Sequence, residues 1–142
     1  MKKTRIMVFG TFDGLHKGHF NFLRQAKKLG ANQNPFLIVS IARDSNVKKI
    51  KGKTPLLNEK KRILLLKKSS IADKVVPSGL RSHLPHILKE KPDIIALGYD
   101  QNDYTENLEE KLEKRGLKTK VVRLKPYKKH IYKNHLLRKN QI

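Results

Sequence analysis

Two histidines three residues apart, His16 and His19, stand in a glycine-rich stretch and are the residues of this sequence best suited to phosphate chemistry. Gly10, Gly14 and Gly18 surround them, and a glycine lets the backbone come close to an anion because it has no Cβ. The stretch therefore brings two imidazoles to a place where a phosphate group can bind. Such a pair can also be a metal pair or a polar helix start, but no cysteine and no convincing third ligand accompany it, which disfavours zinc.

The elements that must position these histidines are a strand before them and a helix after them. The apolar run at residues 6–9 is typical of a buried strand, and Phe20, Leu23 and Ala26 recur at helical spacing. Open α/β sheets bind ligands at the carboxyl ends of their strands, and a helix amino terminus there offers N–H groups to phosphate oxygens. The pattern therefore predicts a phosphate-binding junction between strand and helix.

The Gly-Thr-Phe-Asp run at residues 10–13, followed by the His-x-Gly-His element at residues 16–19, resembles the signature of the cytidylyltransferase-like nucleotidyltransferases. The resemblance implies that His16 and His19 stabilise the α-phosphate of a nucleoside triphosphate while pyrophosphate leaves, and that neither is a covalent nucleophile. It also implies Mg²⁺, bound with the triphosphate, as the cofactor, and no metal-ligating residues. The nucleotide-binding residues that it implies in this stretch are Gly10, Thr11, Phe12 and Gly18.

The composition is that of one small, strongly basic domain. Of the 142 residues, 37% are hydrophobic, which is enough for one core. No stretch approaches the length of a membrane span and no signal-peptide pattern follows the first residues, so we expect a cytoplasmic protein. The formal net charge is +21, from 33 Lys and Arg against 12 Asp and Glu, and it attracts polyanions. Attraction of nucleotides, attraction of RNA and a proteome-wide lysine bias explain this charge equally well.

Alternating patterns along the chain predict a five-stranded parallel sheet. After the first helix, strands are favoured at residues 36–41, 71–76, 94–97 and 117–124, and helices at 58–69, 84–90 and 106–115. Asn58 is expected to cap the 58–69 helix, with Ile63, Leu64 and Leu66 on its inner side and Leu65 as a further candidate. The order predicts a single Rossmann-like, doubly wound α/β domain with strand order 3-2-1-4-5 and helices on both faces. We expect this nucleotidyltransferase domain at residues 1–126 and a basic helix or tail at 127–142 that packs on or near the site.

Lysines follow the second strand in residues 48–53, a segment that indicates a loop or a short turn of helix at the same edge of the sheet. A solvated charge run is the simplest explanation of most lysine clusters. The family resemblance implies instead that lysines here contact the phosphates of both substrates, and Lys49 and Lys51 are the predicted catalytic pair. Arg62 is expected to be structural and to pair with a nearby acid, whereas His83 and His86 are expected to be surface residues.

The stretch at residues 91–101 is the second informative one, with Gly98 at the end of a central strand. Gly98 leaves room for a nucleotide, and the carboxylate of Asp100 can accept a hydrogen bond from a ribose or base or can orient a lysine; a polar turn is the alternative. The Gly-Tyr-Asp-Gln sequence at residues 98–101 resembles the archaeal-type FAD synthases of the same superfamily. That resemblance implies transfer of AMP from ATP to FMN, with CTP and glycerol-3-phosphate as the alternative substrates.

The basic tail departs from the family pattern, because no Ser or Thr follows Thr119. Asn134 is expected to cap a final helix and to donate to phosphate, with Lys129 or Lys133 supplying positive charge. The tail and the net charge also favour a protein of another class, an RNA-binding protein on a nucleotidyltransferase scaffold, although aromatic residues for base stacking make up only 6%. The resembled enzymes are commonly dimers, which makes a homodimer an expectation.

Overall fold

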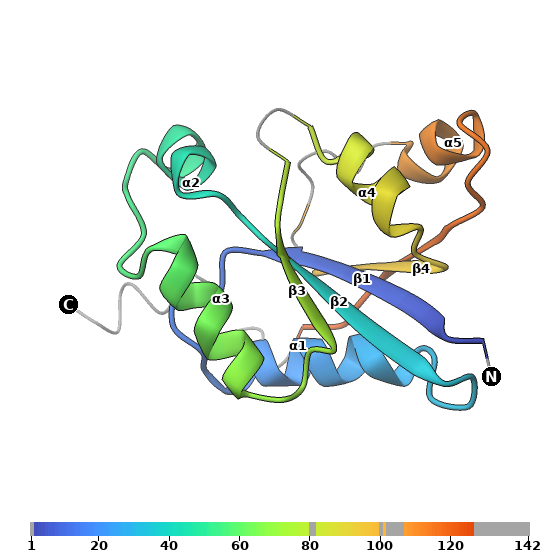
Figure 1. The fold of residues 1–142 in the computed structure, drawn as a ribbon, viewed down its shortest axis with the longest axis horizontal. Helices are drawn as coiled ribbons and strands as arrows, with labels where there is room; N and C mark the ends of the chain where they lie inside the picture. The colour runs from blue at the N-terminus through green and yellow to red at the C-terminus, as the bar shows by residue number, and fades with distance from the viewer. Residues whose placement is uncertain (1, 80–81, 100, 102–106, 127–142) are drawn as a thin grey trace.

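Five parallel strands form the centre of the structure. The computed structural model describes residues 2–79, 82–99, 101 and 107–126, and its sheet has the order β3-β2-β1-β4-β5, as predicted (Figure 1). All neighbouring strands run parallel. The strands are β1 (Thr4–Gly10), β2 (Pro35–Ile41), β3 (Lys74–Pro77), β4 (Ile94–Leu97) and β5 (Lys120–Arg123).

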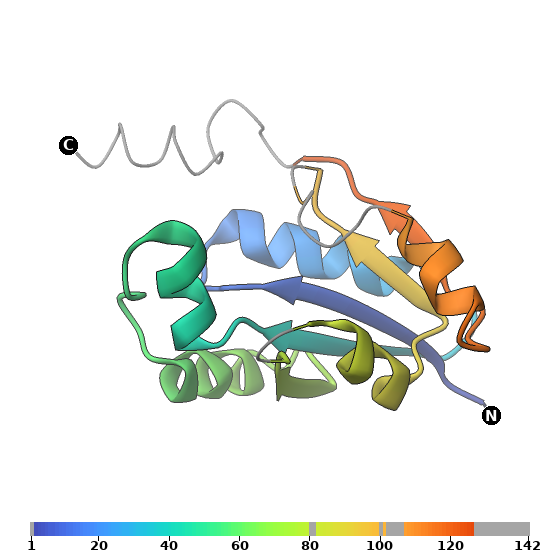
Figure 2. The same ribbon diagram turned by 90° about the horizontal axis from the view of Figure 1, so that it is seen from above.

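Helices cover both faces of this sheet, which confirms the predicted doubly wound α/β architecture. They are α1 (Lys17–Lys28), α2 (Asp44–Lys51), α3 (Glu59–Lys68), α4 (Leu84–Glu90) and α5 (Leu108–Glu113). Figures 1 and 2 show α1 and α3 on one face and α4 and α5 on the other, with α2 beyond the carboxyl end of β2. None of the described helices combines the length and the apolar character that a membrane crossing requires.

The two faces of the sheet have separate hydrophobic cores because successive strand residues point to opposite sides. The core under α1 and α3 contains Ile6, Val8, Leu23, Ala26, Leu37, Val39 and Leu66. The core under α4 and α5 contains Met7, Ile38, Ile87, Ile95, Leu108 and Leu112. Successive residues of β1 enter the two cores in turn, which explains why its sequence is apolar without a break.

At its carboxyl edge the sheet opens between β1 and β4. β1 pairs with β2 as far as Gly10, its last residue, and β4 pairs with β5 as far as Leu97, its last residue. Between β1 and β4, in contrast, the pairing ends at Met7 opposite Ile95. The chain leaves β1 for α1 on one face and β4 for α5 on the other (Figure 1). This opening is therefore the topological switch point, the place where open α/β sheets bind ligands.

α2 is longer than the loop or short helical turn predicted from residues 48–53. It has eight residues and begins at Asp44, an acid in the first helical turn, where it interacts favourably with the helix dipole. Val47 is buried and anchors the inner side of the helix. Gly52, with φ 72°, ends it in the left-handed conformation that favours glycine. The lysines of this segment therefore stand on a helix.

α3 begins at Asn58, whose side chain accepts from the backbone N–H of Lys61 (2.9 Å), as predicted for an N-cap. The assignment of its inner side was partly wrong, because Leu64 is 51% and Leu65 is 38% exposed. The prediction is confirmed for Leu66, which is buried, and for Ile63, which packs against the core, and the buried side of α3 also contains Arg62. The buried face of α3 therefore includes an arginine and leaves Leu64 and Leu65 on the exposed side.

Candidate active site

The two motif histidines form a reciprocal cap at the first turn of α1. His16 is the N-cap residue, and its Nδ1 accepts from the backbone N–H groups of Gly18 (3.0 Å) and His19 (3.4 Å). The Nδ1 of His19 accepts in turn from the backbone N–H of His16 (3.3 Å). This is a capping box in which imidazoles take the places usually held by a hydroxyl and a carboxylate or amide.

The cap determines which ring nitrogen carries the proton. A neutral imidazole has one donor and one acceptor nitrogen, and Nδ1 is the acceptor in both His16 and His19, so the proton lies on Nε2. The two rings are stacked, with centroids 3.7 Å apart and planes 20° from parallel. The start of α1 therefore carries two neighbouring imidazoles in the same Nε2–H tautomer.

Burial favours the neutral form of both imidazoles. It lowers the pKa of His16, and it is the main reason why the pKa of His19 falls to about 4. The charges of His16 and Lys51 lower the pKa of His19 further, while a hydrogen bond with the backbone of Gly14 acts in the opposite direction. At neutral pH each ring keeps one N–H donor without being protonated, and in His19 this donor is the one that bonds the backbone of Gly14.

Phe12 supports His19 from inside the protein. Its side chain is buried, and its ring meets the His19 ring edge-on at a centroid distance of 5.3 Å. A Cβ at Gly10 would lie 2.5 Å from the Phe12 ring, so a glycine is needed there to seat that ring. Phe12 therefore faces the core, and its backbone, rather than its side chain, is the part suited to contact a nucleotide.

Arg62 joins the histidine loop to the end of β2 and the start of α2. Its side chain is 0% exposed and donates to the backbone carbonyls of Thr11 (2.9 Å), Ala42 (2.8 Å) and Leu57 (3.0 Å). Its Nη2 also pairs with the carboxylate of Asp44 at 2.6 Å. The structural role predicted for Arg62, with a nearby acid as partner, is confirmed.

Asp13 is a second link between the histidine loop and the segment after α2, and it was missed from the sequence. Its Oδ2 accepts from the backbone N–H of Leu56 and its Oδ1 from that of Leu57, each at 2.7 Å. Both carboxylate oxygens are thus engaged by main-chain donors. Within the part of the chain that the structure describes, no group of three or more His, Cys, Asp or Glu could hold a metal ion.

The predicted catalytic lysines stand on α2, whose last turn contains Lys49 and Lys51. Both side chains are exposed. The charge of Lys51 is the smallest of the contributions that lower the pKa of His19. Of these two lysines, Lys51 is therefore the one that the structure links to His19.

The turn after β4 brings Gly98 to the far side of the opening. Its N–H donates to Oε1 of Gln101 (2.7 Å), and Nε2 of Gln101 donates to the carbonyl of Phe9 in β1 (2.8 Å). Arg123 donates to the carbonyls of Gly98 and Gln101, each at 2.8 Å. Sequence reasoning missed this use of Gln101, because Phe9 lies 92 positions away.

The predicted site residues thus fall into three groups. The structure gathers one group around the start of α1, namely Gly10, Thr11, Phe12, His16, Gly18 and His19. It places Lys49 and Lys51 on α2 and Gly98 after β4. A third group lies outside the described residues: Asp100, Asn134, the lysines at 129 and 133, and the rest of the 127–142 tail.

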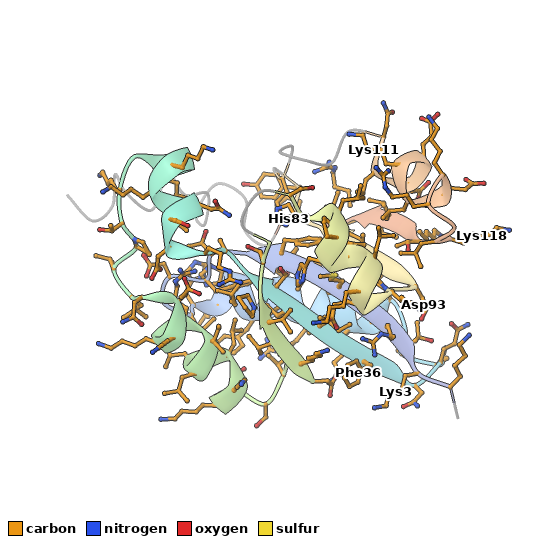
Figure 3. All side chains as sticks on the ribbon, turned by 45° about the horizontal axis from the view of Figure 1, so that its top comes forward. Lys3, Phe36, His83, Asp93, Lys111 and Lys118 are labelled. Atoms are coloured by element: carbon orange, nitrogen blue, oxygen red, sulfur yellow. The ribbon has the colours of Figure 1, made fainter. Side chains whose placement is uncertain are left out.

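His83 and His86, which were expected to be surface residues, are half-buried and have partners on the sheet. His83, at the start of α4 (Figure 3), meets the ring of Phe9 edge-on at a centroid distance of 4.9 Å. Nε2 of His86 lies 2.8 Å from the hydroxyl of the buried Ser40. Burial lowers the pKa of both histidines. The polar Ser40 in an otherwise apolar strand was the signal that a polar partner would pack under α4.

Known proteins resemble this chain in sequence over most of its length. The family profile described as cytidylyltransferase-like matches residues 7–139. An FAD synthase of Korarchaeum cryptofilum (strain OPF8) is 45% identical over 120 residues, which are 84% of this chain and 80% of that protein. An FAD synthase of Methanosarcina barkeri (strain Fusaro) is 46% identical over 121 residues, which are 85% of this chain and 83% of that protein.

A solved structure shows the same architecture. The lipopolysaccharide core biosynthesis protein from Thermoplasma volcanium GSS1 matches with a TM-score of 0.78 and 36% identity, over 87% of this chain and 97% of that one. The profile match spans both the His-x-Gly-His element and the stretch at residues 91–101. This chain belongs to the cytidylyltransferase-like family and is a nucleotidyltransferase.

Proposed function

We propose that this protein is an FMN adenylyltransferase, in other words an FAD synthase, which transfers AMP from ATP to the phosphate of FMN and releases pyrophosphate. The observation that carries the reaction type is the pair of Nε2–H imidazoles, His16 and His19, at the helix start beside the switch point. The similarity to FAD synthases over more than four fifths of the chain supports ATP and FMN as the substrates.

The reaction is an in-line displacement at the α-phosphorus of ATP. A phosphate oxygen of FMN forms a new bond to this phosphorus, and the bond from it to the oxygen that bridges to the β-phosphorus breaks, so that pyrophosphate leaves. The phosphate of FMN is ionised at neutral pH, and the attack therefore needs no strong general base. Catalysis consists mainly of positioning and of stabilising the charge in the transition state.

The two histidines stabilise that charge. His16 and His19 donate from Nε2 to the non-bridging oxygens of the α-phosphate, where hydrogen bonds matter most in the transition state. The backbone of Gly10, Thr11 and Phe12 lies against the nucleotide phosphates, together with Gly18 in the first turn of α1. Because the rings are neutral before the substrate binds, they need not lose a proton to the solvent at any step.

Lysines and the residues across the opening complete the proposed site. Lys51, whose charge acts on His19, neutralises phosphate oxygens, and Lys49 on the same helical turn assists it. Gly98 leaves room for the nucleotide, with Asp100 and Asn134 proposed as further nucleotide contacts outside the described residues.

Magnesium would be held in this site together with ATP. The described residues contain no cluster of ligands for an ion, and the carboxylate of Asp13 is engaged by the backbone. We propose that the triphosphate oxygens would hold the ion, whose charge would screen the pyrophosphate. The protein's own contribution is the set of hydrogen-bond donors and lysines described above.

Pyrophosphate release by the purified protein with magnesium tests the proposal, with ATP and FMN compared against CTP and glycerol-3-phosphate. We expect turnover with the first pair and a loss of about 10²- to 10³-fold in kcat for His16→Ala. Turnover with the second pair alone would keep the reaction type and replace the substrates. The RNA-binding alternative would be favoured by a different result: no pyrophosphate release with either pair, and RNA binding that weakens steeply with salt and survives loss of both histidines.

A further inference from the structure

The side chain of Gln101 bridges the opening between β1 and β4. The backbone ladder between these strands ends at Met7 opposite Ile95. Beyond that point, Oε1 of Gln101 accepts from the N–H of Gly98 and its Nε2 donates to the carbonyl of Phe9. A carboxamide has both the acceptor and the donor of a peptide unit. Gln101 therefore continues the pairing of the two strands with a side chain where their backbones no longer pair.

The turn that carries Gln101 is held firmly on its other side. The N–H of Gln101 donates to the carbonyl of Gly98 (3.1 Å), which closes the turn. Nη1 of Arg123, at the end of β5, donates to the carbonyls of Gly98 and Gln101. Because the turn is anchored to β5, the carboxamide holds the end of β1 at a set distance from it.

The end of β1 leads directly to the reacting groups. Phe9 is followed by Gly10, whose missing Cβ makes room for the ring of Phe12. That ring packs against the ring of His19. A shift of Phe9 away from the turn after β4 therefore moves the support of His19, although neither Phe9 nor Gln101 belongs to the histidine motif.

We propose that Gln101 is a positioning residue for nucleotidyl transfer, because it sets the width of the switch-point opening across which the nucleotide meets the two histidines. The inference rests on the proposed function. A bound nucleotide in its ground state can adapt to a wider opening, whereas the in-line transition state requires the α-phosphate to meet both imidazoles at once. Loss of the bridge should therefore lower kcat more than it raises KM.

Two substitutions break the bridge in different ways. Gln101→Asn keeps both polar groups but shortens the side chain by one C–C bond of about 1.5 Å, so that it cannot reach both Gly98 and Phe9. Gln101→Glu keeps the length and the acceptor for Gly98, but it removes the donor and places a carboxylate oxygen against the Phe9 carbonyl.

Thr119→Val is a matched control at the other end of the sheet. The hydroxyl of Thr119 donates to the carbonyl of Pro92 at 2.7 Å, just before β4 and β5 begin. This variant also loses a side-chain hydrogen bond to the main chain, and valine has the shape of threonine. Its site lies at the amino edge of the strands, away from the opening.

The experiment measures kcat and the KM values for ATP and FMN of the full chain and the three variants, each at a temperature well below its melting midpoint. We expect kcat to fall about 10- to 100-fold in both Gln101 variants, while both KM values and the kcat of Thr119→Val stay within about threefold of the unmodified protein. A kcat that is retained in both Gln101 variants, or lost equally in Thr119→Val, would overturn the positioning role. If the unmodified protein showed no turnover with ATP and FMN, the proposed function would be refuted, and this inference with it.

Discussion

Replacing His16 by alanine and by asparagine separates the two roles that this imidazole has in the structure. Its Nδ1 caps α1 by accepting from the backbone N–H groups of Gly18 and His19. Its Nε2 carries the proton that we assign to the α-phosphate. Alanine removes both atoms. Asparagine, a preferred N-cap residue, places a carboxamide oxygen near the position of Nδ1 but does not reach the position of Nε2.

The two roles differ in size and in the quantity that reports them. Loss of an N-cap acceptor costs about 1 kcal/mol of unfolding free energy, which lowers the melting temperature of a domain of this size by about 3 °C. Loss of a donor to developing phosphate charge costs about 10²- to 10³-fold in kcat, or about 3–4 kcal/mol of transition-state stabilisation. The loss of transition-state stabilisation therefore exceeds the loss of unfolding free energy. Asparagine at position 16 should restore the unfolding free energy but not kcat.

Thermal melts and steady-state kinetics of both variants check this reasoning. We expect His16→Ala to lose stability and activity, and His16→Asn to keep its melting temperature within about 1 °C while losing activity to the same extent. If His16→Asn recovered the activity of the unmodified protein, the histidine would act only as a cap. If both variants melted equally early, the capping account of this residue would be wrong.

Three further predictions follow from the same contacts. The free energy of unfolding should fall as the pH drops from about 6.5 towards about 4, because unfolded histidine binds a proton near 6.5 and folded His19 only near 4. Urea unfolding at several pH values should show a smaller pH dependence of this free energy in His19→Gln, because a glutamine keeps the capping box without titrating. Arg62→Ala should cost about 3–5 kcal/mol in urea unfolding, because it leaves a buried network without its donors, whereas Lys61→Ala on the exposed side should change stability by about 0.5 kcal/mol or less. Lys51→Met should raise the pKa of His19 in an NMR titration and raise the KM for ATP. An unchanged pKa in Lys51→Met would remove the electrostatic link between Lys51 and His19, and an equal rise in Lys49→Met would contradict the assignment of this link to Lys51 alone.

The strand order and the position of the histidine loop could be predicted because they depend on local patterns. β1 alternates between two cores, so Ile6, Met7 and Val8 are all apolar, and the helix that follows has its own 3.6-residue period. A parallel sheet with helices on both faces then leaves few topologies. The carboxyl edge of β1 is one of the places where such a fold binds ligands, although the cap formed by His16 and His19 already uses the first backbone donors of α1.

The contacts that complete the site could not be predicted in this way, because their partners are distant in the sequence. Asp13 accepts from Leu56 and Leu57, and Gln101 donates to Phe9, and neither pair has a signature in spacing or composition. A carboxylate or a carboxamide at the end of a strand suits a ligand and a main-chain partner equally well. The tertiary fold decides between them, and here it uses both side chains to hold loops in place.

The spacing of the His-x-Gly-His element follows from the cap itself. An N-cap and an N3 residue are three positions apart, and at this separation each side chain reaches the backbone N–H of the other. Each Nδ1 that accepts such a bond leaves the proton on Nε2, so the geometry that begins α1 also selects the donor tautomer of His16 and His19. A serine and a glutamate at these positions would start the helix equally well, but the carboxylate would repel a phosphate and no pair of neutral donors would remain. Under the function that we propose, the need for those donors, rather than the stability of the helix, accounts for imidazoles at both positions.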